Sequence, residues 1–250
     1  WGSGHIIQFS HTQLMLVAWL WLATLSGAKL RLSPRVVLLL FILGLQPVLA
    51  APVIYLAFEV SSGHHLFWFI QLMKYGGAIA AVPIGAAVAL AIVEKWRPST
   101  GFEVERNALL FSMLLFAAGG GIGFMISGST VTVPAHYHGS IVGVTIAFMG
   151  ISYHLLHQLG YARVSGRMAR WQPGIYGGGQ LMHIVGLAWS GGYNVARKST
   201  DAERGIEQVA GMGLMGLGGL ISIVGGIIFL VLMYRSLKAG RSDTGVDQSS

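Results

Sequence analysis

The sequence predicts an all-α, polytopic membrane protein with seven transmembrane helices. Three observations indicate this fold class. The chain has 250 residues, of which 54% are hydrophobic and only 10% are charged, whereas about 25% of the residues in a soluble domain are charged. Several apolar runs reach the length of about 20 residues that a helix needs to cross a bilayer. The basic residues lie mainly in the short connections between these runs, as they do in membrane proteins.

The expected helices follow one another closely along the chain. We place them at residues 6–28, 35–58, 65–93, 108–129, 136–160, 174–195 and 208–234. Together they make a single transmembrane domain over residues 1–238. Residues 239–250 are polar and lack a hydrophobic pattern, so we expect a disordered tail there.

The basic residues also predict the orientation in the membrane. The connections on one side carry far fewer of them, only Arg197, Lys198 and Arg204. The positive-inside rule therefore places the amino end outside the cell and the carboxyl end in the cytoplasm. We expect the membrane to be the inner membrane of a bacterium or archaeon. The net charge of +7 is explained by this topology, and we expect no nucleic-acid partner. The richer side carries Lys29, Arg31, Arg35, Lys95, Arg97, Arg106, Arg163, Arg167, Arg170, Arg235, Lys238 and Arg241.

Two histidines, His136 and His138, stand where we expect an extended segment to turn into the fifth helix. On a helix, residues two apart point about 200° from each other. The pair therefore cannot bind one metal ion from a single face, but it can ligate two cofactors on opposite sides of the helix. The chain has no cysteine, which leaves histidine as the main soft-metal ligand. We expect His136 and His138 to be axial ligands of two haems.

Three more histidines, His5, His64 and His65, fall at the same outer depth of the predicted bundle. Three neutral imidazoles without cysteine or carboxylate suit copper, with iron or zinc as alternatives. Adjacent residues on a helix diverge by about 100°, so we expect an irregular helix start at residues 61–63 that lets both neighbours reach one ion. No such support exists for His11, for His154 and His157 near the cytoplasmic end, or for His183, which we expect to be a packing residue.

At these residues the sequence resembles the catalytic subunit of the haem-copper oxidase superfamily, which includes terminal oxygen reductases and membrane nitric oxide reductases. The resemblance covers nearly the whole chain, as helices six to twelve of a twelve-helix core. It implies a haem-copper binuclear centre and a second, low-spin haem. The matching stretches are Trp1 to His5, Gly63 to Trp68, Ala80 to Gly85 and Val131 to His138.

The resemblance implies a role for each candidate residue. His136 would bind the high-spin haem that faces the copper, and His138 would bind the low-spin haem. Copper, or iron as an alternative, would be held by the histidines at 5, 64 and 65. Arg197 and Lys198 resemble the basic pair near the haem propionates. Gln8 lies on the same face as the first copper ligand, one turn away, where it would hydrogen-bond the bound substrate or a neighbouring helix.

The first helix departs from the family pattern. Common oxygen reductases carry a tyrosine four residues after the first copper ligand, which supplies an electron and a proton for O–O cleavage. Phe9 stands at that position and has no phenol. Nitric oxide reduction joins two NO molecules and needs no O–O cleavage, but the cytochrome-c-dependent enzymes have a glutamate in this helix where only Gln8 is available. The sequence is therefore most similar to a divergent nitric oxide reductase branch with glutamine at the site.

Residues that serve proton transfer in pumping oxidases are also replaced. Ile84 and Ala87 lack the hydroxyl and the amine of the family's proton path, and we expect no Asp or Glu within a helix core. Glu59 lies near the outer surface, where it is either a solvated loop acid or a group that admits protons. These departures argue against a conventional pumping oxygen reductase.

We therefore expect a membrane reductase that converts nitric oxide to nitrous oxide, with reduction of O2 to water as the alternative. A cofactor-free seven-helix transporter or receptor and a haem-binding protein without turnover are more remote alternatives. The chain starts at Trp1, so we expect a processed, split or truncated polypeptide. The expected partners are a polypeptide or segment that supplies the first five helices and the other low-spin haem ligand, an electron donor such as cytochrome c, a cupredoxin or a quinol, and membrane lipid.

Overall fold

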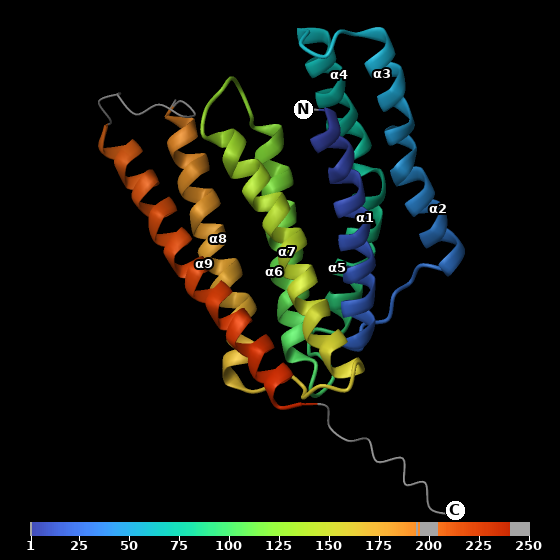
Figure 1. Cartoon of the computed structure of the whole chain (residues 1–250), viewed down its shortest axis with the longest axis vertical. Coiled ribbons are helices and arrows are strands. Elements are labelled where there is room, and N and C mark those ends of the chain that lie inside the picture. Colours follow the sequence, from blue (N-terminus) through green and yellow to red (C-terminus); the bar gives the residue numbers. More distant parts are fainter. Residues whose placement is uncertain (1, 194, 196–204, 241–250) are drawn as a thin grey trace, which may run out of the picture. The chain divides into compact units, whose positions relative to one another are not determined.

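The computed structural model describes residues 2–193, 195 and 205–240. Over this part of the chain the regular elements are helices (Figure 1), which confirms the all-α class. They are α1 (Gly2–Leu25), α2 (Pro34–Leu45), the 3-10 helix η1 (Gln46–Ala50), α3 (Ala51–Ala57), α4 (Gly63–Gly76), α5 (Ala78–Glu94), α6 (Glu103–Phe124), α7 (Thr132–Gln158), α8 (Arg167–Gly192) and α9 (Ile206–Lys238).

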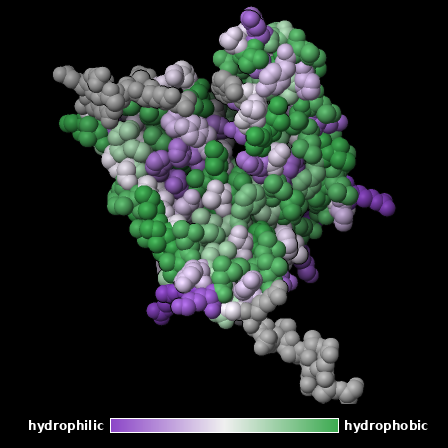
Figure 2. Space-filling model, viewed as in Figure 1, coloured by the Kyte–Doolittle hydropathy of each residue, from purple (hydrophilic) through white to green (hydrophobic). Residues whose placement is uncertain are grey.

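The helices have the length and the surface of a multi-pass membrane protein. Large apolar side chains stay exposed along α2, η1 and α3, among them Leu38, Leu49 and Leu56, and Figure 2 shows hydrophobic residues over much of the visible face. Such a surface is unfavourable in water and suited to lipid. Six stretches are long and apolar enough to span a membrane: Gly2–Leu25, Pro34–Ala57, Gly63–Glu94, Glu103–Phe124, Thr132–Gln158 and Ile206–Lys238.

The span expected at residues 174–195 corresponds to α8, a helix of 26 residues that is too polar to stand among these six. It carries Gln172, Gln180 and His183 in its interior. α8 packs against α6, α7 and α9, so neighbouring helices cover much of its surface. A helix in this position needs less lipid-facing apolar surface than the others.

Proline and polar residues explain where the helix boundaries differ from the prediction. The second expected helix is interrupted by η1, with Pro47 and Pro52 in the first turns of η1 and α3, because proline cannot donate the hydrogen bond that a continuous helix requires. α7 begins at Thr132, so the predicted extended segment before His136 is wrong. Pro134 is tolerated there because the N–H groups of a helix's first turn have no carbonyl partner within the helix, so the absence of one from proline costs no hydrogen bond.

The chain divides into two compact units, Trp1–Ser99 and Thr100–Ser250. In the first unit α1 and α2 pack on α5. In the second, α6 and α7 approach closely, because a Cβ atom on Gly119 would lie 2.7 Å from the carbonyl carbon of Gly139. The core around this contact contains Ala108, Leu115, Ala135, Ile146 and Ile184.

Candidate haem and metal ligands

His136 lies in the second turn of α7, and α6 holds its ring in place. Its Nδ1 atom is 2.7 Å from the carbonyl oxygen of Gly119. A carbonyl oxygen only accepts hydrogen bonds, so Nδ1 carries the proton and Nε2 keeps a lone pair. Gly123 makes room for the ring, because a Cβ atom there would lie 2.7 Å from Nδ1. His136 is therefore oriented for ligation through Nε2.

His138 has the same tautomer for a similar reason. Its Nδ1 atom is 2.9 Å from the carbonyl oxygen of Pro134 on the same helix, which leaves Nε2 available. Whereas His136 bonds to α6, the ring of His138 lies 5.0 Å from the ring of His183 on α8, centroid to centroid. The two rings thus face different helices, as their spacing predicts. Histidines that bind metals in proteins usually donate their second N–H to a carbonyl or carboxylate, and both side chains fit this pattern.

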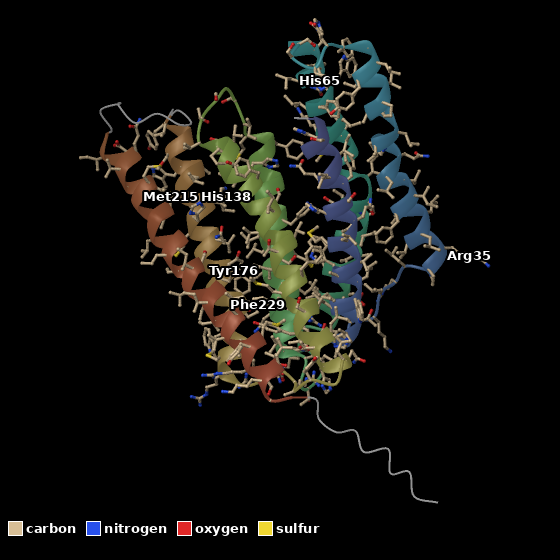
Figure 3. All side chains as sticks on the ribbon, in the orientation of Figure 1. Arg35, His65, His138, Tyr176, Met215 and Phe229 are labelled. Carbon is tan, nitrogen blue, oxygen red and sulfur yellow. The ribbon has the colours of Figure 1, made fainter. Side chains whose placement is uncertain are left out.

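His183 is a candidate that the sequence reasoning missed. Its Nδ1 atom is 3.0 Å from the carbonyl oxygen of Met215 on α9, so it has the same tautomer as the two histidines of α7. Figure 3 labels His138 and Met215 close together in this part of the second unit. His183 is therefore hydrogen-bonded between helices, as expected of a packing residue, and its contact with the predicted haem ligand His138 is what the sequence did not show.

His65, on α4 of the first unit, is fully buried. Among the described residues, neither of its ring nitrogens has a hydrogen-bond partner. Its ring contacts those of Tyr55 and Phe69, at centroid distances of 5.0 and 4.9 Å. A buried polar atom without a partner destabilises a fold by about 1–3 kcal/mol. Coordination of a metal ion would satisfy one of the two nitrogens, so His65 fits the role of a metal ligand.

His5 and His64 lie on different sides of His65. The ring of His5 is 6.3 Å from that of Phe69, which also contacts His65. His64 instead stacks on Phe58, with ring centroids 5.8 Å apart and an interplanar angle of 14°. The predicted irregular helix start is wrong, because α4 begins regularly at Gly63 and the Ser62 hydroxyl accepts a hydrogen bond from the His65 backbone N–H.

Across the described residues, no group of three His, Cys, Asp or Glu side chains is close enough to hold a metal ion. Of the three predicted copper ligands, His5 and His65 flank Phe69, and His64 lies apart from them. His5 and His65 therefore fit a shared metal ion better than His64 does. The fit is better for the two predicted haem ligands, each of which has a defined tautomer.

Tyr55 is a second residue that the sequence reasoning missed. It lies on α3, beside His65 and Phe69, and its hydroxyl is next to Gly2, where a Cβ atom would collide with it. Phe9 is buried in the same unit and offers no phenol. The first unit therefore contains a phenol beside a candidate metal ligand, although from a different helix than the family pattern predicts.

The remaining predicted site residues are less informative. Gln8 is half-buried on α1, one turn from His5 and on the same face. Arg197 and Lys198 lie outside the described residues. So do residues 241–250 of the expected tail.

Comparison with known proteins reveals relatives whose names state no function. The chain is 31% identical over 277 residues to uncharacterized protein RP382 of Rickettsia prowazekii (strain Madrid E), with 95% of this chain and 54% of that protein covered. It is 27% identical over 179 residues to an uncharacterized protein of Aquifex aeolicus (strain VF5), with 69% of this chain and 42% of that protein covered. No family model matches the chain. The chain thus spans about half the length of these relatives.

Proposed function

We propose that this chain is part of the catalytic core of a membrane reductase of the haem-copper type, which reduces nitric oxide to nitrous oxide. One observation carries the proposal. His136 and His138 face different helices, and each has its Nδ1 proton bound to a backbone carbonyl and its Nε2 lone pair available. Two imidazoles prepared in this way on one helix suit the ligation of two flat cofactors.

The chain's residues would hold the cofactors as follows. His136 would ligate the high-spin haem and His138 the low-spin haem, and Arg197 with Lys198 would pair with propionates. His65 and His5, with His64 as the third donor of the motif, would hold copper or, as the alternative, iron. When bound, these groups supply electron transfer and the reduction of the bound gas. The hydrogen bond from His136 Nδ1 to Gly119 keeps the imidazole oriented, and the Gln8 amide would donate to the oxygen of bound nitric oxide.

Nitric oxide is favoured as the substrate because its reduction needs no phenol. Two NO molecules, two electrons and two protons give N2O and water, and no O–O bond is broken. Phe9 replaces the tyrosine that common oxygen reductases use for that cleavage.

Reduction of O2 to water is the second candidate, and Tyr55 favours it. This phenol lies beside His65, with ring centroids 5.0 Å apart. It could donate the electron and the proton that cleavage of an O–O bond requires.

The proposed enzyme includes more than this chain. A further polypeptide or chain segment would supply the first five helices and the second ligand of the low-spin haem. Electrons would come from a cytochrome c, a cupredoxin or a quinol. The complex would sit in the inner membrane of a bacterium or archaeon, with its basic loops in the cytoplasm.

The proposal is tested by the cofactor content and gas consumption of the intact complex. We expect two haems per complex, loss of the low-spin spectrum alone in His138→Ala, and anaerobic consumption of NO with stoichiometric N2O. Absence of haem would instead support the cofactor-free transporter. Haem without consumption of either gas would support a haem-binding protein without turnover. Fast O2 reduction with weak NO turnover would favour the second candidate.

A further inference from the structure

The second unit buries a carboxylate at the end that the positive-inside rule assigns to the cytoplasm. The sequence analysis placed Glu105 and Arg106 in a connection, but α6 begins at Glu103, and both are buried, with 4% and 1% of their surface exposed. The helix starts early because acidic residues in its first turn interact favourably with the helix dipole. The predicted start of this helix at residue 108 is therefore wrong, and Glu105 lies in its buried first turn.

Among the described residues, Glu105 makes a long ion pair, with Arg163. Its Oε2 atom lacks a hydrogen-bond partner, and its Oε1 atom is 3.7 Å from the nearest guanidinium nitrogen of Arg163. That same nitrogen donates to the carbonyl oxygen of Gly101 at 2.6 Å, and the guanidinium lies 4.6 Å from the centroid of the Phe102 ring. Arg163 is thus held mainly by other contacts. A buried carboxylate with one oxygen left without a partner destabilises the fold, which indicates function more than stability.

Glu105 lines a cavity of about 150 Å³. One water occupies about 30 Å³ in the liquid, so the cavity has room for several waters. Its other polar walls are Arg163 and four side chains of α7, namely Tyr153, His154, His157 and Gln158. Water is stable in a cavity when two to four polar partners are available, and these walls supply them. The nearby charged groups Glu103 and Arg106 belong to α6 itself.

A column of polar side chains runs from this cavity into the unit. The Tyr153 hydroxyl donates to Gln172 Oε1 at 3.0 Å, and Gln172 begins a series on α8 that continues with Tyr176, Gln180 and His183. Spacings of four, four and three residues keep the series on one face of the helix, over about 17 Å. Gln180 Oε1 is buried and has no partner in the described part of the chain.

The column ends beside a proposed haem ligand, because the ring of His183 lies 5.0 Å from that of His138. Figure 3 labels Tyr176 between Phe229 and His138 along this unit. Polar side chains thus lie along α8 from the end near the buried carboxylate to the candidate haem ligand, and the Tyr153–Gln172 hydrogen bond links the first of them to the cavity. Glu59, the alternative acid for proton uptake, is exposed on a loop of the first unit.

We propose that the cavity around Glu105 is a hydrated proton-uptake site, in which the Glu105 carboxylate takes a proton from cytoplasmic water and passes it to the polar column of α8. The inference rests on the proposed function, because a gas reductase consumes one proton for each electron. The proton comes from bulk water, moves to Glu105 and then to the waters and side chains beyond it. Glu105 is again a carboxylate after each transfer, so the site needs no co-reactant besides water.

The test compares Glu105→Gln with Glu103→Gln, a matched change two residues away on the partly exposed face of α6. The intact complex is placed in vesicles with a pH dye, and proton uptake and gas consumption are followed together. We expect Glu105→Gln to slow both by roughly tenfold or more, with the haem spectra unchanged and a larger solvent deuterium isotope effect. Glu103→Gln should behave as wild type, and Glu105→Asp should recover part of the rate.

Several results would overturn the inference. One is equal proton uptake in Glu105→Gln and Glu103→Gln. Another is lower thermal stability of Glu105→Gln without any change in proton uptake, which would make Glu105 structural. If that variant does not assemble, Tyr153→Phe decides, because it removes the hydroxyl that reaches Gln172 and should slow uptake in the same way.

A wild-type complex that consumes neither gas would refute the proposed function, but the proton-uptake site at Glu105 could still be tested. Infrared spectra of wild type minus Glu105→Gln, taken at a pH low enough to protonate Glu105, isolate its protonated carboxyl band. Exchange of this band in D2O within seconds is expected for a hydrated site. A band that does not exchange would overturn the inference whatever the activity.

Discussion

The substitution Gly123→Ala tests whether α6 positions His136 for ligation. The new Cβ atom would lie 2.7 Å from His136 Nδ1 and 2.8 Å from Cε1. Carbon atoms do not approach a ring this closely, and a half-buried imidazole cannot swing away freely. The ring must therefore move, which breaks or lengthens the bond from Nδ1 to the Gly119 carbonyl oxygen.

The size of the effect follows from two contributions. Overpacking costs about 1–3 kcal/mol, and loss of the hydrogen bond adds about 1 kcal/mol. Loss of an orienting partner reduces metal affinity about 10- to 100-fold. We therefore expect the high-spin haem, which His136 would ligate, to be lost from most of the purified complex. The low-spin haem on His138 should remain, because its Nδ1 partner is Pro134 on its own helix.

The assay is the haem content and optical spectrum of the purified complex, with Gly121→Ala as the matched control. A Cβ atom on Gly121 meets no heavy atom within 4 Å, and alanine in place of glycine within a helix stabilises it by about 0.5–1 kcal/mol. Gly121→Ala should keep both haems. Equal high-spin haem content in the two variants would refute the claim that Gly123 makes room for a haem ligand.

Three further substitutions test other parts of the site. His183→Phe keeps a ring beside the proposed low-spin haem ligand His138 but removes the hydrogen bond to α9. We expect it to alter the electron paramagnetic resonance signal of the low-spin haem without changing the haem content. His11→Phe, at an exposed position of α1, should leave this signal unchanged. Tyr55→Phe should leave NO consumption within about twofold of wild type, and a loss of O2 reduction of about 100-fold or more would establish the second candidate function. Ser62→Ala removes the cap of α4 at a cost of about 1 kcal/mol and should lower the metal content measured by mass spectrometry, whereas the exposed Ser61→Ala should not.

The helical class could be predicted because apolar composition alone separates membrane helices from soluble ones. Helix ends were less predictable where polar residues belong to helices. Thr132 and Glu105 are polar, yet both lie within helices, because a first turn favours acidic residues and tolerates proline. Hydropathy therefore places the starts of α6 and α7 too late.

The sequence predicts which histidines are candidate ligands, but it predicts only part of how their side chains are arranged. The spacing of His136 and His138 predicts that they face different directions, and their contacts agree with this. The tautomer of His136 could not be predicted, because its partner is a carbonyl on another helix, 17 residues away in the sequence. The position of His183 depends on how α8 packs between α7 and α9, and the stacking of His64 on Phe58 depends on the cap at Ser62. Packing between elements decides such contacts, and local sequence does not encode it.

The polarity of α8 distinguishes a structural helix from a functional one. A helix surrounded by α6, α7 and α9 would be most stable with an apolar inner face, since a buried polar atom without a partner is destabilising. α8 instead turns Gln172, Tyr176, Gln180 and His183 toward one face, and the Oε1 atom of Gln180 stays unpartnered among the described residues. Helix packing alone would not require this pattern, whereas a path for protons between the cavity and His138 would. A cofactor-free transporter could also use such a path, so the haem content of the purified complex separates the two functions.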